Sequence, residues 1–289
     1  MELSTSLNVL WDPPRIAQPD AVTRVAAAGF RRLDMNFTDW LFDGSPFVGA
    51  EWETWVRDIR RAADAAGARF TQAHGPIYDK FAGTPRTAWL HEMSHRSLIA
   101  AGMLGTPWVV FEPETMAGTW DAAHVAAIVQ RNADYFGALL PTAERAGVGI
   151  AIENVADYFG VRRGLGRLYG STPLELLALM AALDHPRIGI CWDTGHAHIQ
   201  QLNQRQAIVA VGPHLRALHI QDNDAKSDQH LLPYYGSIRW EEVMAGLRES
   251  GYGGDFTYEA HNSIRILPDP LRDAALRYAV ALGEYLLAM

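Results

Sequence analysis

Eight apolar, strand-like segments alternate with amphipathic helical segments and predict an α/β fold, a (β/α)8 TIM barrel. Such alternation is typical of a parallel sheet, and each strand–helix unit takes roughly 36 residues. The 289 residues are 48% hydrophobic, which suffices for one large core, so we expect a single domain over residues 1–289. The expected strands are residues 3–9, 31–36, 69–74, 107–112, 148–153, 188–193, 215–221 and 255–259.

The helical segments between these strands have an apolar face and recognisable ends. In residues 51–67, Trp52, Trp55, Val56, Ile59 and Ala63 fall on one face of a helix. Ser171 or Thr172 is the expected N-cap of the helix over 171–184, because Pro173 follows. Several helices are expected to end at a glycine in the left-handed conformation: Gly29, Gly67, Gly105, Gly147 and Gly251. Further helices are expected over 87–105, 119–147, 240–251 and 271–287.

Composition restricts the class of function. The net charge of −8 argues against a large nucleic-acid interface. No run of 18 apolar residues predicts a membrane span, and the first residues lack the basic and apolar segments of a secretion signal. The one cysteine, Cys191, suits a reducing compartment, so we expect a cytoplasmic protein. The oligomeric state stays open, a homo-oligomer included.

Four polar side chains lie at the ends of four of the expected strands: Glu153, Asp193, His219 and Glu259. Because the carboxyl ends of parallel barrel strands converge, these side chains are expected to meet. Three carboxylates and one imidazole suit one divalent metal ion, Mn²⁺, Co²⁺, Mg²⁺ or Zn²⁺. Each residue alone could be a structural polar group at a strand end; the matching positions of all four favour a metal site.

Five segments carry a resemblance to a known family: IAIEN (150–154), WDTGHAH (192–198), LHIQDND (218–224), DQHLLPYYGSIRW (228–240) and YEA (258–260). The chain resembles the xylose isomerase-like TIM barrel superfamily, which holds sugar phosphate isomerases and epimerases and the endonuclease IV type of abasic-site nuclease (AP endonuclease family 2). The resemblance implies that Glu153, Asp193, His219 and Glu259 hold one metal ion. It also implies that Glu153 and Glu259 are the catalytic acid/base pair.

The resemblance and the positions of other residues near the strand ends suggest further substrate-binding residues: His74, His196, Trp11, Asp228 and His230. With His196, the pair Asp228 and His230 could instead hold a second metal ion, as in the nuclease branch. We favour the alternative, in which the pair orients its loop and binds substrate hydroxyls. Arg162, Arg163 and Arg167 share a loop that could recognise phosphate or carboxylate; a solvated loop is the favoured reading.

Two departures from the family pattern bear on the reaction. Nuclease-type members carry a histidine after the fourth strand, where this chain has Phe111 and Glu112. Some ketose 3-epimerases carry an arginine about six residues after the metal histidine, where this chain has Ala225. Enolisation explains the expected residues, because a cation stabilises the enediolate that forms when a carbon next to a carbonyl loses a proton.

The resulting expectation is a metal-dependent isomerase or epimerase of a sugar, keto-sugar or cyclitol. A lyase or dehydratase would use the same residues. An endonuclease IV-like phosphodiesterase and a non-catalytic sugar-binding protein are the alternatives from other classes, and the sequence leaves the substrate open.

Overall fold

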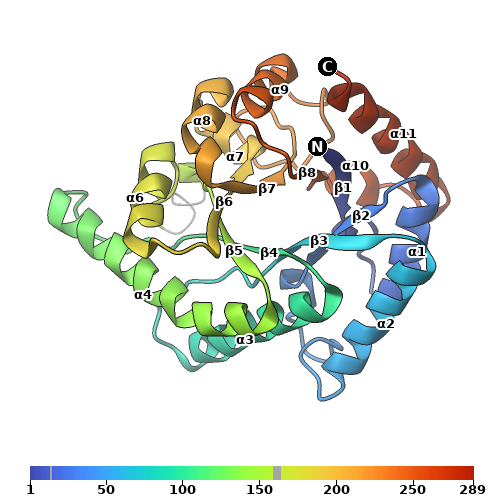
Figure 1. The fold of residues 1–289 in the computed structure, drawn as a ribbon, viewed down its shortest axis with the longest axis horizontal. Coiled ribbons are helices and arrows are strands. Elements are labelled where there is room, and N and C mark those ends of the chain that lie inside the picture. Colours follow the sequence, from blue (N-terminus) through green and yellow to red (C-terminus); the bar gives the residue numbers. More distant parts are fainter. Residues whose placement is uncertain (14, 159–163) are drawn as a thin grey trace.

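The structure, a computed structural model, describes residues 1–13, 15–158 and 164–289. Eight parallel strands form one sheet in the order β7-β6-β5-β4-β3-β2-β1-β8. A parallel bridge between Ile220 and Tyr258 joins the two edges, so the sheet closes into the expected barrel (Figure 1). The strands are β1 (Glu2–Ser6), β2 (Arg32–Asn36), β3 (Arg69–His74), β4 (Trp108–Phe111), β5 (Gly149–Glu153), β6 (Ile188–Asp193), β7 (Leu215–His219) and β8 (Asp255–Tyr258).

Helices surround this barrel and cover the outer faces of its strands (Figure 1). The longer ones are α1 (Gln18–Ala28), α2 (Trp52–Ala65), α3 (Pro85–Leu104), α4 (Ala122–Ala146), α6 (Pro173–Leu183), α8 (Gln204–Val211), α9 (Trp240–Glu249) and α11 (Asp269–Leu287). The short ones are η1 (Leu7–Leu10), η2 (Thr38–Trp40), α7 (Thr194–Ile199), η3 (Gly212–His214) and α10 (Asn262–Arg265). Thr172 is the N-cap of α6 and forms a capping box with Glu175, and all five expected glycine caps have positive φ.

Two expected strands are shorter than their apolar runs. The first strand ends at Ser6, and Leu7–Leu10 form the 3-10 helix η1 with every side chain buried. The apolar run over residues 3–9 predicts a strand, because periodicity cannot separate a short buried strand from a short buried helix. The seventh strand likewise ends at His219, and Ile220 continues it only as an isolated bridge to Tyr258. Helix α1 was expected only through its C-cap, Gly29, and helices α7, α8 and α10 were not expected.

The interior of the barrel is divided into an apolar and a polar half. Val110, Ala151, Cys191 and Ala217, from β4 to β7, form a small apolar cluster separate from the main core. On the other side, Asp34 of β2 and Thr257 of β8 alternate with residues of the outer core and therefore face inward. The carboxyl ends of the strands lie directly above this interior. The inward-facing polar side chains of β8, β1, β2 and β3 therefore lie beneath the residues that end the strands.

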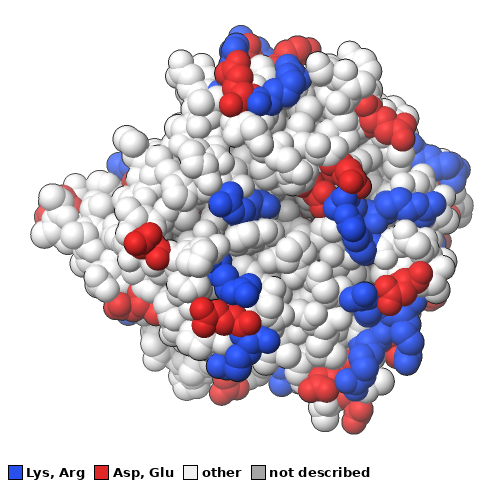
Figure 2. Space-filling model, in the orientation of Figure 1, with Lys and Arg blue, Asp and Glu red and all other residues white. Residues whose placement is uncertain are grey.

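Two further observations concern the helices and one face of the surface. No helix in the described ranges is long and apolar enough to cross a membrane. Acidic and basic side chains are interspersed on the face shown in Figure 2, where basic groups stand beside acidic ones. On this face, the mixed pattern differs from the continuous basic surface that a nucleic-acid-binding face usually presents.

The close approach of β3 and β4 requires a glycine just after His74. A Cβ on Gly75 would lie 2.1 Å from Cε1 of Phe111, a fully buried ring. Gly75→Ala should therefore destabilise the protein by about 1–3 kcal/mol, because the ring must move in a packed core. Gly137→Ala in α4 is the matched control, since nothing lies within 4 Å of its Cβ. Urea unfolding of both variants tests this, and equal midpoints would contradict it.

Candidate active site

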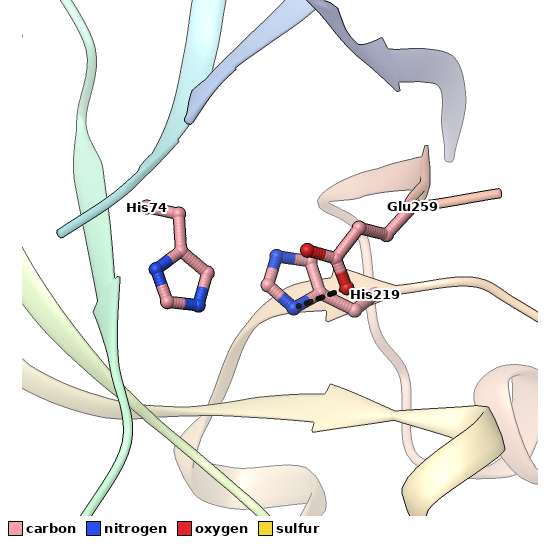
Figure 3. Close-up of side chains that lie close together, drawn as sticks. All are labelled: His74, His219 and Glu259. Carbon is pink, nitrogen blue, oxygen red and sulfur yellow. Dashed lines mark ion pairs between the residues drawn. The ribbon is translucent and has the colours of Figure 1, made fainter. Parts of the chain in front are cut away.

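The four residues predicted to bind metal meet at the carboxyl end of the barrel. Glu153, Asp193 and His219 are the last residues of β5, β6 and β7, and Glu259 follows β8 directly. One ligand atom from each lies within 4.8 Å of those of the others, and all four residues are buried. His219 Nδ1 is 2.8 Å from Glu153 Oε1. The same nitrogen is 3.5 Å from Glu259 Oε2, and the dashed line in Figure 3 joins these two residues.

The electrostatics of this group fit a bound cation. Burial, and then the charges of Glu153 and Asp193, raise the pKa of Glu259 well above its usual range. Burial also raises the pKa of Asp193. The Oδ2 atom of Asp193 is buried and has no hydrogen-bond partner among the described residues. Three crowded carboxylates with an unused oxygen are the arrangement that a divalent ion stabilises, so the residues present fit such an ion.

Glu153 connects two histidines through its two carboxylate oxygens. Its Oε1 faces His219, and its Oε2 is 3.2 Å from His74 Nε2. Burial alone would lower the pKa of His74, but the hydrogen bond and charge of Glu153 raise it to about 9. Burial likewise opposes ionisation of Glu153, but the charge and hydrogen bond of His219 hold its pKa well below the usual range. The two imidazole rings are nearly parallel, with centroids 5.4 Å apart (Figure 3).

Asn154 connects the ends of β5 and β6 and orients His196. Its side chain accepts from the Asp193 backbone N–H at 2.7 Å and donates to the Asp193 carbonyl at 3.0 Å. The Asn154 carbonyl accepts from His196 Nδ1 at 2.8 Å. The Nε2 atom of His196 is thereby turned toward Asp228 Oδ1, at 3.9 Å. Asn154 directly follows Glu153 in the sequence, but no local pattern indicates that it connects two strand ends.

Asp228 and His230 pair with each other beside the four carboxyl-end residues. His230 donates from Nε2 to Asp228 Oδ2 at 2.7 Å and from Nδ1 to the Glu259 carbonyl at 2.8 Å. Gln221 donates to the other Asp228 oxygen at 2.6 Å. Within the described ranges, the clusters with metal-ligand spacing do not include the set His196, Asp228 and His230. This bonding favours the reading in which the pair orients its loop.

A cavity of about 420 Å³ opens above these residues. This volume lies within the range of small-molecule sites, roughly 300–1,000 Å³. Of the predicted site residues, Glu153, Glu259, His74, His196, Asp228 and His230 line it, whereas Asp193 and His219 lie in the cluster beneath them. Trp11 is not part of the lining and packs, partly buried, against the main core. The remaining lining residues are Ile77, Tyr78, Asp79, Glu112, Pro113, Glu114, Val155 and Leu168.

Several of these additional lining residues lie just after strands that the sequence predicts. Glu112 comes directly after β4, and its carboxyl group joins His74 and Glu153 in a second cluster with ligand spacing. Its place after a barrel strand was the signal that could have identified it. Arg162 and Arg163, in the arginine-containing loop, lie outside the described residues. Arg167 of the same loop pairs with Glu175 at 2.5 Å.

Comparison with known proteins gives matches over most of the chain. The family model described as "Xylose isomerase-like TIM barrel" matches residues 22–281. An uncharacterized protein of Methanocaldococcus jannaschii is 29% identical over 180 residues, 62% of this chain and 56% of that protein. A ketose 3-epimerase of Arthrobacter globiformis is 28% identical over 158 residues, 55% of this chain and 47% of that protein. The matches thus span about half the length of these relatives.

Solved structures resemble the chain along its full length. A D-tagatose 3-epimerase-like protein superposes with a TM-score of 0.77 at 20% identity, covering 100% of this chain and 97% of the other. A D-psicose 3-epimerase, solved in the presence of D-fructose, superposes with a TM-score of 0.75 at 17% identity, covering 100% of both chains. At these identities the likeness establishes the fold.

Proposed function

The chain belongs to the xylose isomerase-like TIM barrel family, and we propose that it is a divalent-metal-dependent isomerase or epimerase of a keto-sugar. The observation that carries the proposal is the buried cluster of three carboxylates and one imidazole beneath the cavity. A match to a ketose 3-epimerase supports the reaction class. The full-length likeness to sugar epimerases supports the same barrel geometry.

Glu153, Asp193, His219 and Glu259 would hold the ion. When bound there, a divalent ion would stabilise the negative charge that develops on substrate oxygens when the neighbouring carbon loses its proton. The four side chains come from consecutive strands β5 to β8, whose ends the barrel fixes. Asn154 strengthens this arrangement by holding the end of β6 against the end of β5.

Glu153 and Glu259 are the proposed acid/base pair. They come from β5 and from the residue after β8, so their carboxyl groups approach the cavity from different parts of the barrel rim. One carboxylate would take the proton from the carbon next to the carbonyl, and the other carboxyl group would return a proton. In an epimerase the returned proton arrives on the opposite face, which inverts that carbon.

His74, His196, Asp228 and His230 are the proposed substrate contacts. All four line the cavity, and each carries an imidazole or carboxylate suited to hydroxyl groups. The hydrogen bonds between Asp228 and His230 and between His196 and Asn154 would hold these groups in place before substrate arrives. Trp11 stays a proposed contact for the apolar face of the sugar ring, although it lies outside the cavity lining.

Elemental mass spectrometry on protein purified without added metal or chelator is the first test. We expect close to one Mn, Co, Mg or Zn per chain, because the described residues contain one cluster of four side chains with metal-ligand spacing. With that ion present, D-psicose, D-tagatose or D-fructose should incorporate deuterium from D₂O at the carbon next to the carbonyl. Two or three Zn per chain with cleavage of abasic DNA would replace this proposal with a phosphodiesterase. Loss of water from the sugar would indicate a lyase.

A further inference from the structure

The loop that joins β7 to α9 carries Asp228 and His230 to the cavity in a strained backbone conformation. His230 has a φ of 48°, and Ala225 and Tyr234 of the same loop have φ values of 62° and 71°. These values lie in the left-handed region, which residues other than glycine adopt at a cost in free energy. Such a conformation persists only where surrounding contacts hold the chain, so this loop needs contacts that keep it in place.

Contacts hold the tip of the loop on two sides. On one side, His230 Nδ1 donates to the Glu259 carbonyl at 2.8 Å, and the His230 carbonyl accepts from the Asn262 N–H at 3.2 Å. On the other side, Gln221 Nε2 donates to Asp228 Oδ1 at 2.6 Å. The second Asp228 oxygen accepts from His230 Nε2 at 2.7 Å, so both oxygens of this carboxylate have a donor. Gln221 is therefore the anchor on the Asp228 side.

Gln221 also reaches the proposed metal cluster. It is fully buried, and its Nε2 is 3.4 Å from Asp193 Oδ1. An amide nitrogen carries two protons, so one side chain can face both carboxylates. Thr194 fixes the Gln221 main chain, because its hydroxyl group accepts from the Gln221 N–H at 3.1 Å and donates to the Gln221 carbonyl at 2.8 Å. Gln221 thus connects a proposed metal ligand with a proposed substrate contact.

The Gln221 amide occupies space that a glycine leaves open. A Cβ at Gly195 would lie 2.2 Å from the amide carbon and oxygen of Gln221. Gly195 lies within the short helix α7 and its φ is not positive, so the backbone conformation does not require a glycine there. The glycine instead makes room for the amide. The segments 192–198 and 218–224 are therefore matched to each other through this contact.

We propose that Gln221 is a positioning residue that holds the Asp228 carboxylate, and through it the His230 ring, at a fixed place beside Asp193. The inference rests on the proposed function and adds a residue outside the cavity, because Gln221 is not one of the described residues that line it. Without Gln221, Asp228 Oδ1 would lose this donor and the carboxylate could rotate away from His230. Substrate hydroxyl groups would then meet a pair that is not fixed in place before they bind.

Steady-state kinetics with Mn²⁺ and the active ketose (D-psicose, D-tagatose or D-fructose) tests this role. Gln221→Leu should raise KM by about 10-fold, the usual effect of losing a hydrogen bond to a charged group, and should leave kcat nearly unchanged. Gly195→Ala displaces the same amide and should give the same result. Gln18→Leu, a change at a buried glutamine of α1 that bonds to Met35, is the matched control and should alter neither value. Circular dichroism and thermal unfolding check that each variant is folded.

A double-mutant cycle separates positioning from a general structural role. Asp228→Ala removes the carboxylate through which Gln221 would act. In that background, Gln221→Leu should change KM by less than about twofold, because the effects of residues in one hydrogen-bond network are not additive. A further increase of about 10-fold in the double variant would mean that Gln221 acts independently of Asp228, which would overturn the inference.

A second readout needs neither metal nor substrate. In metal-free protein labelled with ¹⁵N-histidine, the Nε2 proton of His230 should exchange slowly with water, because it is bonded to Asp228. Gln221→Leu and Gly195→Ala should accelerate this exchange and Gln18→Leu should not, and His230→Gln identifies the signal. An unchanged exchange rate and an unchanged KM in both variants would overturn the inference. If the unchanged protein placed deuterium in none of the three ketoses, the proposed function would fail, and the His230 proton would still decide the role of Gln221.

Discussion

Replacing Glu259 with glutamine is expected to lower kcat by a factor of about 10²–10⁴, the usual contribution of a general acid or base. Glutamine has nearly the same shape as glutamate but cannot carry the proton, and Glu259 is buried beside Glu153 and His219. The fold should survive, because the pKa of Glu259 is raised well above its usual range by burial, so a neutral side chain suits this position. The measurement is deuterium incorporation into the active ketose, at saturating substrate and excess Mn²⁺.

Two further variants show whether the loss reflects proton transfer. Glu284→Gln in α11 removes an exposed carboxylate far along the chain from the site and should leave the rate unchanged. Glu153→Gln should be at least as damaging as Glu259→Gln, because Glu153 also contacts His74 and His219. Excess Mn²⁺ in the assay offsets a weakened ion site, so a persistent loss points to the missing carboxylate. Near-normal turnover by Glu259→Gln would mean that the two-carboxylate mechanism is wrong.

The sequence predicted the proposed metal cluster well because barrel geometry converts strand ends into spatial neighbours. Glu153, Asp193 and His219 each end an apolar run, and parallel strands of one barrel finish at the same rim. Hydrophobic runs are also the strongest signal of buried strands, so the positions of these three residues followed from locating the runs. The polar residue after the eighth run, Glu259, completed the set by the same reasoning.

The remaining features depend on contacts that no local pattern encodes. Trp11 follows the first apolar run, but the chain turns into η1 before it, which changes the direction in which its ring can point. Glu112 was visible in the sequence, but its approach to His74 and Glu153 depends on the packing of three strands.

The second large effect concerns the stability that a bound ion adds. An ion that binds only the folded chain stabilises it by about 2.7 kcal/mol at 100 times its Kd, which for a chain of this size corresponds to a rise in Tm of roughly 5–10 °C. We expect this rise with Mn²⁺ because three carboxylates are crowded in one buried cluster. Without a cation, burial and then the charges of Glu153 and Asp193 hold the pKa of Glu259 high, so its ionisation costs stability.

His219→Ala should remove most of this stabilisation. The substitution deletes the one imidazole of the cluster, and the Kd for Mn²⁺ should rise by at least about 100-fold, because losing a ligand exceeds the usual effect of losing its supporting residue. The control is His185→Ala, since His185 lies after α6 and pairs with Glu144, away from the cluster. Thermal unfolding with and without Mn²⁺ gives the comparison. An unchanged metal content and an unchanged Mn²⁺-dependent Tm in His219→Ala would remove His219 from the ligand set.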